Sequence, residues 1–294
     1  MASAGNGGIL GPRNQPVETT EKLNTFTGDG TFTAQTDQTI ADVFVLAGGG
    51  GGGTVGANEA GGGGGGAGGY RLKTNHPIPA SPVAVTVGGG GAANTEGSNS
   101  IFAGSSPLTS TGGGQGGGSG SGGTSMNGGS GGGKGFVSGG GNPANPPYDS
   151  GTGNEGGYTP SEGNQGGPTG GAPLYAGGGG GGHTAEGGPG NSYPANGGTG
   201  TANDVNSPTA SPSPVTYALG GGSGRYPLSA SGAPAPANSG KGGGGASCTL
   251  GGGGSGGTGG SGIVVVKEVA QAAASGVWQM NTVYDYVKAG DWTN

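Results

Sequence analysis

Few residues of this chain could carry out chemistry, and none stands at the spacing that a catalytic or metal site requires. His76 and His183 are the two histidines, and Cys248 is the one cysteine. Neither histidine has a cysteine, aspartate or glutamate at a zinc-ligand spacing, so we expect ordinary loop histidines rather than ligands or general bases. A lone cysteine forms no disulfide within the chain and leaves the redox compartment open.

The segment GGSGGGKG, Gly128–Gly135, loosely resembles a phosphate-binding loop. Gly135 stands where that loop carries the Ser or Thr that binds magnesium, and no apolar strand precedes the segment. Such matches arise by chance in a chain with 87 glycines among 294 residues. Paired carboxylates on a rigid element are also lacking. We therefore expect no cofactor, no metal and no enzymatic activity.

Charge and hydropathy exclude two further classes of protein. The chain has 9 Lys and Arg against 15 Asp and Glu, a net charge of -6, and its basic residues are scattered. No stripe of them could neutralise phosphates, so nucleic acid is not an expected partner. The chain lacks an apolar run of membrane-spanning length, and its first residues lack a basic start followed by an apolar segment, so we expect neither membrane insertion nor a secretory signal.

The elements that position these residues must be unusual, because the composition is poor in side chains that build a core. Charged residues make up 8% of the chain and apolar residues 28%. Such a chain has too little apolar area to offset the ordering entropy of its whole length by burial alone, and disorder is the first interpretation of its composition. The glycine runs, however, are bracketed by strand patterns rather than by charged tracts.

Short strand patterns recur in the first third of the chain and once more near its end. In LNTFTGDGTFTA, from Leu23, Phe and Thr alternate on both sides of Gly28–Gly30, which predicts a hairpin. The late segment Ile263–Val269 is expected to return and pair with the early strands. We predict an all-β fold, an antiparallel β-sandwich of the jelly-roll or tumour-necrosis-factor-like type with large glycine-rich insertions. Its other strands are expected at 41–48, 70–74, 82–88 and 100–104.

The long glycine runs are expected to form polyglycine helices rather than spacers. A polyproline II helix has three residues per turn and no internal hydrogen bonds, so its amides and carbonyls point outward. Where side chains are absent, neighbouring helices can approach closely and bond these groups to one another. We predict a bundle of such helices from the runs Gly48–Gly53, Gly61–Gly66, Gly88–Gly91, Gly177–Gly182, Gly242–Gly245 and Gly251–Gly254.

Three regions follow from these patterns. Residues 1–22 are expected to be an extended arm, 23–269 the glycine-rich sandwich, and 270–294 a hinge with a short amphipathic helix. Within the domain, the region of about 112–260 shows no strand or helix periodicity, and its part 143–236 is interpreted as loops rich in proline and tyrosine. Its tyrosines are candidate surface recognition residues, because Tyr gives amphipathic contact area with few rotors; they could equally cap the glycine bundle. They are Tyr148, Tyr158, Tyr175, Tyr193, Tyr217 and Tyr226.

The order of FTGDGTFTAQTDQTIADVFVLAGGGGGG, GGGGGAGGYRL, VTVGGGG, GSNSIFAG and GGSGIVVVKE resembles the glycine-rich domain common in bacteriophage tail and virion proteins. The resemblance covers about 23–268. A tumour-necrosis-factor-like sandwich with inserted polyglycine helices is known for the glycine-rich domain of anaplastic lymphoma kinase, and polyglycine bundles occur in some phage adhesins. The resemblance implies a non-enzymatic, trimeric virion component.

The first functional hypothesis is therefore a phage tail-fibre or adhesin protein, assembled in the host cytoplasm and carried in the virion. Its expected partners are other virion proteins, copies of itself in a homotrimer, and a host receptor or glycan. The arm and the C-terminal helix are expected to anchor it through Ile9, Leu10, Trp278, Tyr284 and Trp292.

Two alternatives stay open. The protein could be a capsid decoration or head-fibre protein. More remotely, it could bind ice, as glycine-rich bundles of springtails do, although those repeat Gly-x-x regularly and use disulfides.

Overall fold

The computed structural model describes residues 20–36, 38–56, 61–118, 126–136, 150–170, 176–191, 195–225, 230–248 and 252–269. Within these residues the protein has strands and no helix of the α or 3₁₀ type. The expected amphipathic helix of 270–294 and nearly all of the arm of 1–22 lie outside the described residues.

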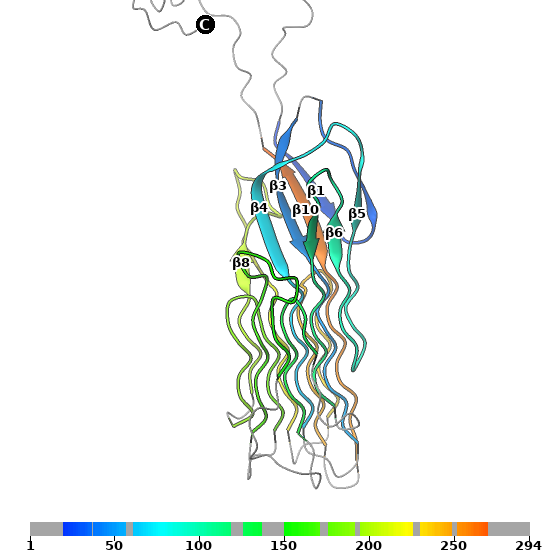
Figure 1. Ribbon diagram of the computed structural model, residues 1–294, viewed down its shortest axis with the longest axis vertical. Coiled ribbons are helices and arrows are strands. Elements are labelled where there is room, and N and C mark those ends of the chain that lie inside the picture. The colour runs from blue at the N-terminus through cyan, green and yellow to red at the C-terminus, as the bar shows by residue number, and fades with distance from the viewer. Residues whose placement is uncertain are drawn as a thin grey trace, which may run out of the picture.

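Two four-stranded antiparallel sheets form a sandwich, as the sequence predicts (Figure 1). The first sheet has the order β1-β10-β3-β4, with β1 Lys22–Phe26, β10 Ile263–Glu268, β3 Ile40–Leu46 and β4 Tyr70–Pro77. The second has the order β2-β5-β6-β7, with β2 Gly30–Phe32, β5 Val83–Thr86, β6 Ser100–Phe102 and β7 Leu108–Ser110. The late strand β10 lies between the early strands β1 and β3, which confirms the expected return of the chain.

The main core lies between the two sheets. Alternate residues of β3 and β10 face alternate residues of β2, β5, β6 and β7. On β5 only one face is buried, since Val83 and Val85 are enclosed while Ala84 and Thr86 are exposed. The buried members of this core are Phe32, Ala41, Val43, Val45, Ile78, Val83, Val85, Phe102, Leu108, Val264 and Val266.

The other face of β3 and β10 is buried as well, which explains why 43–46 of β3 and 263–266 of β10 are continuous apolar runs rather than alternating ones. A hairpin of β8 Thr201–Asn203 and β9 Val215–Tyr217 contributes to its cover. The second core contains Phe44, Leu46, Ala67, Tyr70, Val205, Tyr217, Ala218, Ile263 and Val265. This hairpin lies in the region 143–236, so the interpretation of that region as loops alone was wrong. Two strands of three residues are too short to show a period in the sequence.

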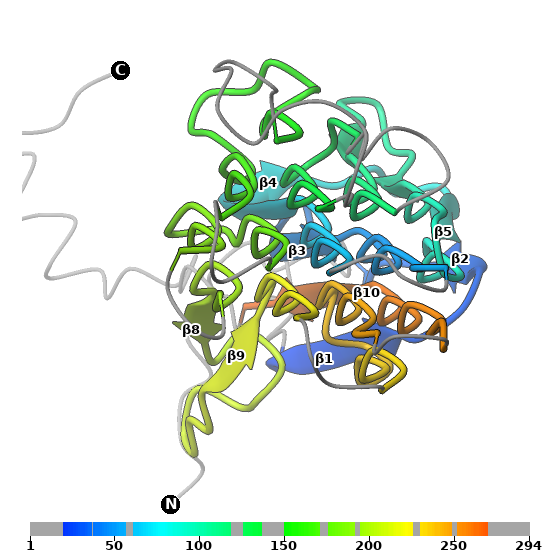
Figure 2. The ribbon, with the colours of Figure 1, turned by 90° about the horizontal axis from the view of Figure 1, so that it is seen from below.

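A bundle of polyglycine helices extends from one end of the sandwich (Figures 1 and 2). Along Gly48–Gly53, each amide donates to a different neighbouring segment from the amide before it, and the pattern repeats every three residues. A period of three residues with no internal bond identifies a polyproline II helix. The acceptors are in 95–98 for Gly48 and Gly51, in 257–260 for Gly49 and Gly52, and in 63–66 for Gly50 and Gly53.

The helix Gly48–Gly53 lies in the interior of the bundle. Its carbonyls accept from three further segments, 91–94, 113–116 and 243–246. Six neighbours therefore surround it, three as acceptors and three as donors. The other two six-glycine runs, Gly61–Gly66 and Gly177–Gly182, also exchange hydrogen bonds with neighbours on all sides. All three are buried throughout, so a six-glycine run marks an interior helix.

Peripheral helices tolerate side chains at positions that face away from the bundle. In 255–262 the sequence SGGTGGSG places Ser255, Thr258 and Ser261 three residues apart, while the glycines between them pack against neighbouring backbone. Ser255 and Thr258 are exposed. In Gly88–Gly91, a Cβ on Gly89 would meet no atom within 4 Å. The expected run Gly251–Gly254 differs from the others. Its described residues precede the helix 255–262, and Gly254 forms a bridge with Val55 there.

Candidate functional site

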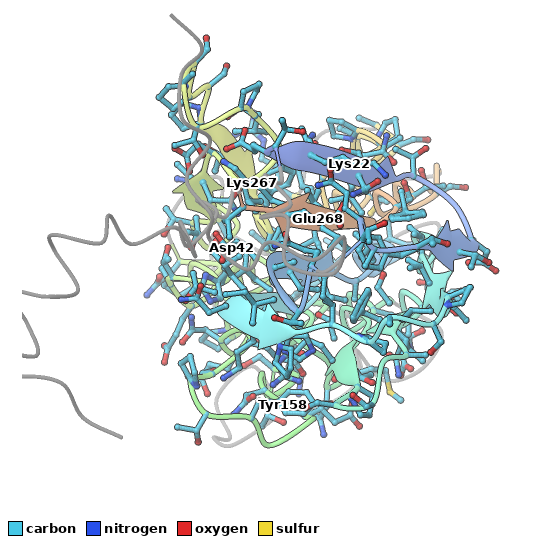
Figure 3. The ribbon with its side chains drawn as sticks, turned by 90° about the horizontal axis from the view of Figure 1, so that it is seen from above. Lys22, Asp42, Tyr158, Lys267 and Glu268 are labelled. Carbon is cyan, nitrogen blue, oxygen red and sulfur yellow. The ribbon has the colours of Figure 1, made fainter. Side chains whose placement is uncertain are left out.

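The described chain begins and ends side by side at the end of the sandwich remote from the bundle. Lys22 and Glu268 are register partners of β1 and β10, whereas the opposite ends of β3 and β10, Leu46 and Ile263, lead into the bundle. Figure 3, seen from above, shows Lys22 and Glu268 at this end. We call this end the terminal pole.

Buried polar contacts fix the strands at the terminal pole. The Glu268 side chain is fully buried; its Oε1 accepts from the Gln35 amide at 2.6 Å and its Oε2 from Asn24 Nδ2 at 2.9 Å. Lys267 Nζ donates to the Ser207 carbonyl at 2.9 Å and lies 4.0 Å from Glu21 Oε2. Each charged group therefore has a partner, as burial requires.

We call the end of the bundle that is remote from the sandwich the distal pole. The described parts of the helices end there. Isolated antiparallel bridges join Val55 to Gly254, Gly61 to Phe136, Ala176 to Arg225 and Ala230 to Ser247. These bridges hold the distal ends of helices that are far apart in sequence next to one another.

Most of the sequence-predicted site residues lie outside the described residues. Among the tyrosines these are Tyr148, Tyr175, Tyr193 and Tyr226, and among the anchoring candidates Ile9, Leu10, Trp278, Tyr284 and Trp292. The structure describes Tyr158 and Tyr217, and brings neither to the distal pole.

Tyr217 is buried, and its expected place on the surface is wrong. It is 2% exposed, and its ring lies 5.1 Å from that of Phe44 between centroids. Burial raises the pKa of Tyr217. The physical reason is that β9 covers the outer face of β3, where an aromatic ring is needed to complete the second core.

Tyr158 is half-buried on a loop beside the sandwich (Figure 3). The Arg71 guanidinium carbon lies 3.7 Å from the centroid of its ring, a cation–π contact. Asn154 shapes the loop: its Oδ1 accepts from the Tyr158 amide and its Nδ2 donates to the Tyr158 carbonyl, both at 3.0 Å. The loop also carries Glu162, fully buried, whose Oε2 accepts from the Thr111 amide at 2.9 Å.

A small open cavity of about 130 Å³ lies between β4 and this loop. On one side the rings of Tyr70 and His183 are stacked, with centroids 4.3 Å apart and planes at 22°. Burial raises the pKa of Tyr70 and lowers that of His183. The lining residues are Tyr70, Arg71, Leu72, Lys73, Pro160, Ser161 and His183. Sequence analysis missed this site, because its residues are far apart in the chain and match no motif.

His76 and the segment Gly128–Gly135 take part in the packing and hydrogen bonding of the fold. His76 is 7% exposed, packs edge-on against Phe102, and has its pKa lowered by burial. The segment Gly128–Gly135 is a bundle helix, and the amides of 128–134 all donate to backbone carbonyls of the protein, so they cannot cradle a phosphate. Within the described ranges, no group of three or more His, Cys, Asp or Glu side chains could hold a metal ion. The described residues also contain no helix with the length and hydropathy needed to cross a bilayer.

A family model described as a glycine-rich domain matches residues 24–268, which include both sheets and the bundle. No curated protein matches the chain.

Proposed function

The chain belongs to the glycine-rich domain family, and from this premise we propose that it is a non-enzymatic structural protein of a bacteriophage virion, of the tail-fibre or adhesin type. In this proposal the sandwich attaches to the particle, the bundle is a rigid spacer, and the distal pole faces the host surface.

The observation that carries the proposal is the opposition of the two poles. The chain enters at Thr20 and leaves at Val269 beside the paired residues Lys22 and Glu268, and the helix ends gather at the other pole. A helix such as 47–55 spans about 28 Å at about 3.1 Å per residue. The hydrogen-bonded bundle thus holds the anchored terminal pole away from the exposed distal pole, an arrangement that suits an attachment protein.

The proposed anchoring residues belong to the segments that adjoin the terminal pole. Ile9 and Leu10 precede Thr20 in the chain, and Trp278, Tyr284 and Trp292 follow Val269. We propose that these segments bind other virion proteins and that the protein assembles as a homotrimer. Native mass spectrometry of the purified full chain measures the oligomeric state, and a monomer would contradict the trimer.

The proposed host-facing residues are tyrosines whose described neighbours in sequence lie at the distal pole. Tyr175 precedes Ala176, and Tyr226 follows Arg225, and these two neighbours form a bridge there. Replacement of both tyrosines by Ser should reduce binding of the protein to host cells without changing its thermal unfolding. Unchanged binding would remove the tyrosines from the recognition surface.

The experiment that tests the function is to locate the protein in purified particles of the phage that encodes it. Mass spectrometry should detect it in the virion, and cryo-electron microscopy should place it at the distal part of the tail. Placement on the capsid would favour the alternative of a head-fibre or decoration protein. Absence from purified particles would overturn the virion assignment.

One observation favours the remote ice-binding alternative. Ser255 and Thr258 form a short row of exposed hydroxyl side chains about 9 Å apart, whereas the Ser261 hydroxyl is hydrogen-bonded to Asn238. The neighbouring helix presents Ala233, Pro234 and Pro236 instead, so the row does not extend into a hydroxyl-bearing face. A measurement of thermal hysteresis decides this alternative: activity would support it, and its absence would remove it.

A further inference from the structure

The cavity beside β4 lies near the junction of the bundle and the sandwich and has no role in the proposed function, which assigns recognition to the distal pole. It is bounded by Tyr70–Lys73 of β4, by Pro160 and Ser161 of the loop, and by His183, which follows the interior helix Gly177–Gly182. Three parts of the chain that are distant in sequence thus meet around one hollow.

The aromatic side of the cavity is preorganised. The Tyr70 hydroxyl accepts from Asn203 Nδ2 at 2.8 Å, its ring lies 4.9 Å from the Phe44 ring, and His183 Nδ1 shares a hydrogen bond with Thr201 Oγ1. Both stacked rings are therefore held from behind. Binding sites for small molecules typically combine such aromatic walls with a few placed polar groups.

The β4 side of the cavity offers an unpaired backbone donor and acceptor. β4 is an edge strand, and the Tyr70 amide points away from β3, since it donates to the Glu162 carbonyl at 3.0 Å. Strand alternation turns the N–H and C=O of Leu72, two residues on, to the same side. Neither group has a hydrogen-bond partner within the described part of the chain.

The charge of the cavity is opposite to that of the protein. Arg71 and Lys73 line it, and no acidic residue does, whereas the chain as a whole carries a net charge of -6. The Arg71 guanidinium is held by the Tyr158 ring and by the Thr109 carbonyl, to which it donates at 2.8 Å. Lys73 is exposed and available to a ligand. An anionic ligand is therefore favoured.

We propose that this cavity binds a carboxylated monosaccharide unit, such as a hexuronic acid. The sugar ring packs against the half-buried ring of His183, which the buried Tyr70 ring supports. Its hydroxyls bond to the Leu72 N–H and C=O, and its carboxylate lies near Lys73. A phosphate fits less well, because anion nests use several unpaired amides and only that of Leu72 is found here among the described residues. An extended peptide fits less well, because the edge is covered at Tyr70 by Glu162 and distorted at Asn75, where φ is 51°.

The test is isothermal titration of the purified full chain with glucuronate, with glucose and with acetate. We expect saturable binding of glucuronate with a dissociation constant of about 1 mM, as a ligand of about a dozen non-hydrogen atoms reaches. Glucose and acetate should each bind at least about fivefold more weakly, since each lacks one half of the recognised chemistry. The same titration with an acidic oligosaccharide that ends in glucuronate distinguishes two sources of the ligand. Tighter binding of the oligosaccharide than of glucuronate would identify the end of a polymer, rather than the free sugar, as the ligand.

The matched variants are Lys73→Gln and Lys22→Gln. Loss of the Lys73 charge should weaken glucuronate binding about fivefold, the size expected for an exposed ion pair. Lys22→Gln removes an exposed lysine of β1, at the other edge of the same sheet, and should leave binding unchanged. The amide resonance of Leu72 should shift on titration in the parent protein.

Three results would overturn the proposal. They are no saturable binding of glucuronate up to about 50 mM, fifty times the expected constant; equal binding of acetate and glucuronate; and equal losses in the two lysine variants. Because the cavity is distant from the distal pole, failure here leaves the virion proposal intact, and absence from virions would leave the sugar site intact.

Discussion

The backbones of Gly52 and Gly244 lie so close that a Cβ added to Gly52 would stand 1.9 Å from the Gly244 carbonyl oxygen. Neither helix is free to withdraw. The Gly52 amide donates to the Gly257 carbonyl at 2.9 Å, and the Gly257 amide donates to the Gly244 carbonyl at 2.8 Å. Three helices are thereby tied in a triangle whose spacing requires glycine.

Gly52→Ala should therefore destabilise the protein by about 3 kcal/mol or more, because overpacking here displaces hydrogen-bonded backbone rather than a flexible side chain. Urea denaturation of the purified variant measures the loss.

Gly89→Ala is the matched control. A Cβ there would meet no atom within 4 Å, and alanine lowers the entropy of the unfolded chain, so the change should be neutral or stabilise by about 0.5 kcal/mol. Equal losses in the two variants would contradict close packing of the interior helix.

The second core predicts a large effect at a residue that faces away from the main core. Phe44 is fully buried against Tyr70 and Tyr217, so Phe44→Ala should cost about 3–5 kcal/mol of unfolding free energy. Val215→Ala on β9, where Val215 is 46% exposed, should change the stability by less than about 0.5 kcal/mol. A small loss for Phe44→Ala would mean that the hairpin β8-β9 does not cover this face in solution.

The buried carboxylate of Glu162 should be needed for the loop beside β4. Its Oε2 accepts from the Thr111 amide at 2.9 Å and its Oε1 from the Gly156 amide at 3.4 Å. Glu162→Ala leaves at least one buried amide unpaired and should cost about 1–3 kcal/mol in thermal or urea unfolding. Glu96→Ala, at an exposed glutamate of the bundle, should be close to neutral. If the two variants were equally stable, the Glu162 contacts would carry no net energy.

Stability should fall as the pH drops below 7. Burial lowers the pKa of both His76 and His183 in the folded state. The unfolded chain, with its histidine pKa near 6.5, then binds more protons than the folded protein as the pH falls from about 7.5 towards 5. The free energy of unfolding should decrease over this window, by at most about 1.4 kcal/mol per pH unit and histidine. Urea denaturation at several pH values measures the slope.

A His76→Asn/His183→Asn variant should have a flatter profile over the same window. An unchanged slope in this variant would assign the pH dependence to other groups.

The bundle could be predicted from the sequence because its interior helices consist of uninterrupted glycine, which we interpreted as polyglycine helices. A helix with six neighbours, such as Gly48–Gly53, has no position at which a side chain fits, so an uninterrupted glycine run carries the signal. Peripheral helices such as 255–262 keep glycine only where they face neighbours, and their G-G-x pattern resembles a low-complexity linker. Their packing depends on contacts that a single segment does not encode.

The sequence predicted strands at the positions of β3, β4, β5, β6 and β10, where the structure has them. The hairpin predicted around Gly28–Gly30 was wrong, because β1 pairs with β10 and β2 with β5, so the Asp-Gly turn joins the two sheets instead of two paired strands. The hairpin β8-β9 was missed because its strands are short, and the burial of Tyr217 was missed with it. The cavity beside β4 depends on the meeting of Tyr70, Ser161 and His183, which only the bundle's hydrogen-bond register decides. No local pattern specifies such a meeting.

The central claim is that the glycine runs are ordered by hydrogen bonds between helices, and amide hydrogen exchange followed by NMR tests it most directly. The amides of Gly48–Gly53, Gly62–Gly66 and Gly177–Gly182 donate to neighbouring helices, so their exchange should be slowed by at least about a thousandfold. Gly89 and Gly90, whose amides have no partner among the described residues, should exchange fast. Fast exchange throughout Gly48–Gly53 would contradict the account and identify these runs as flexible spacers.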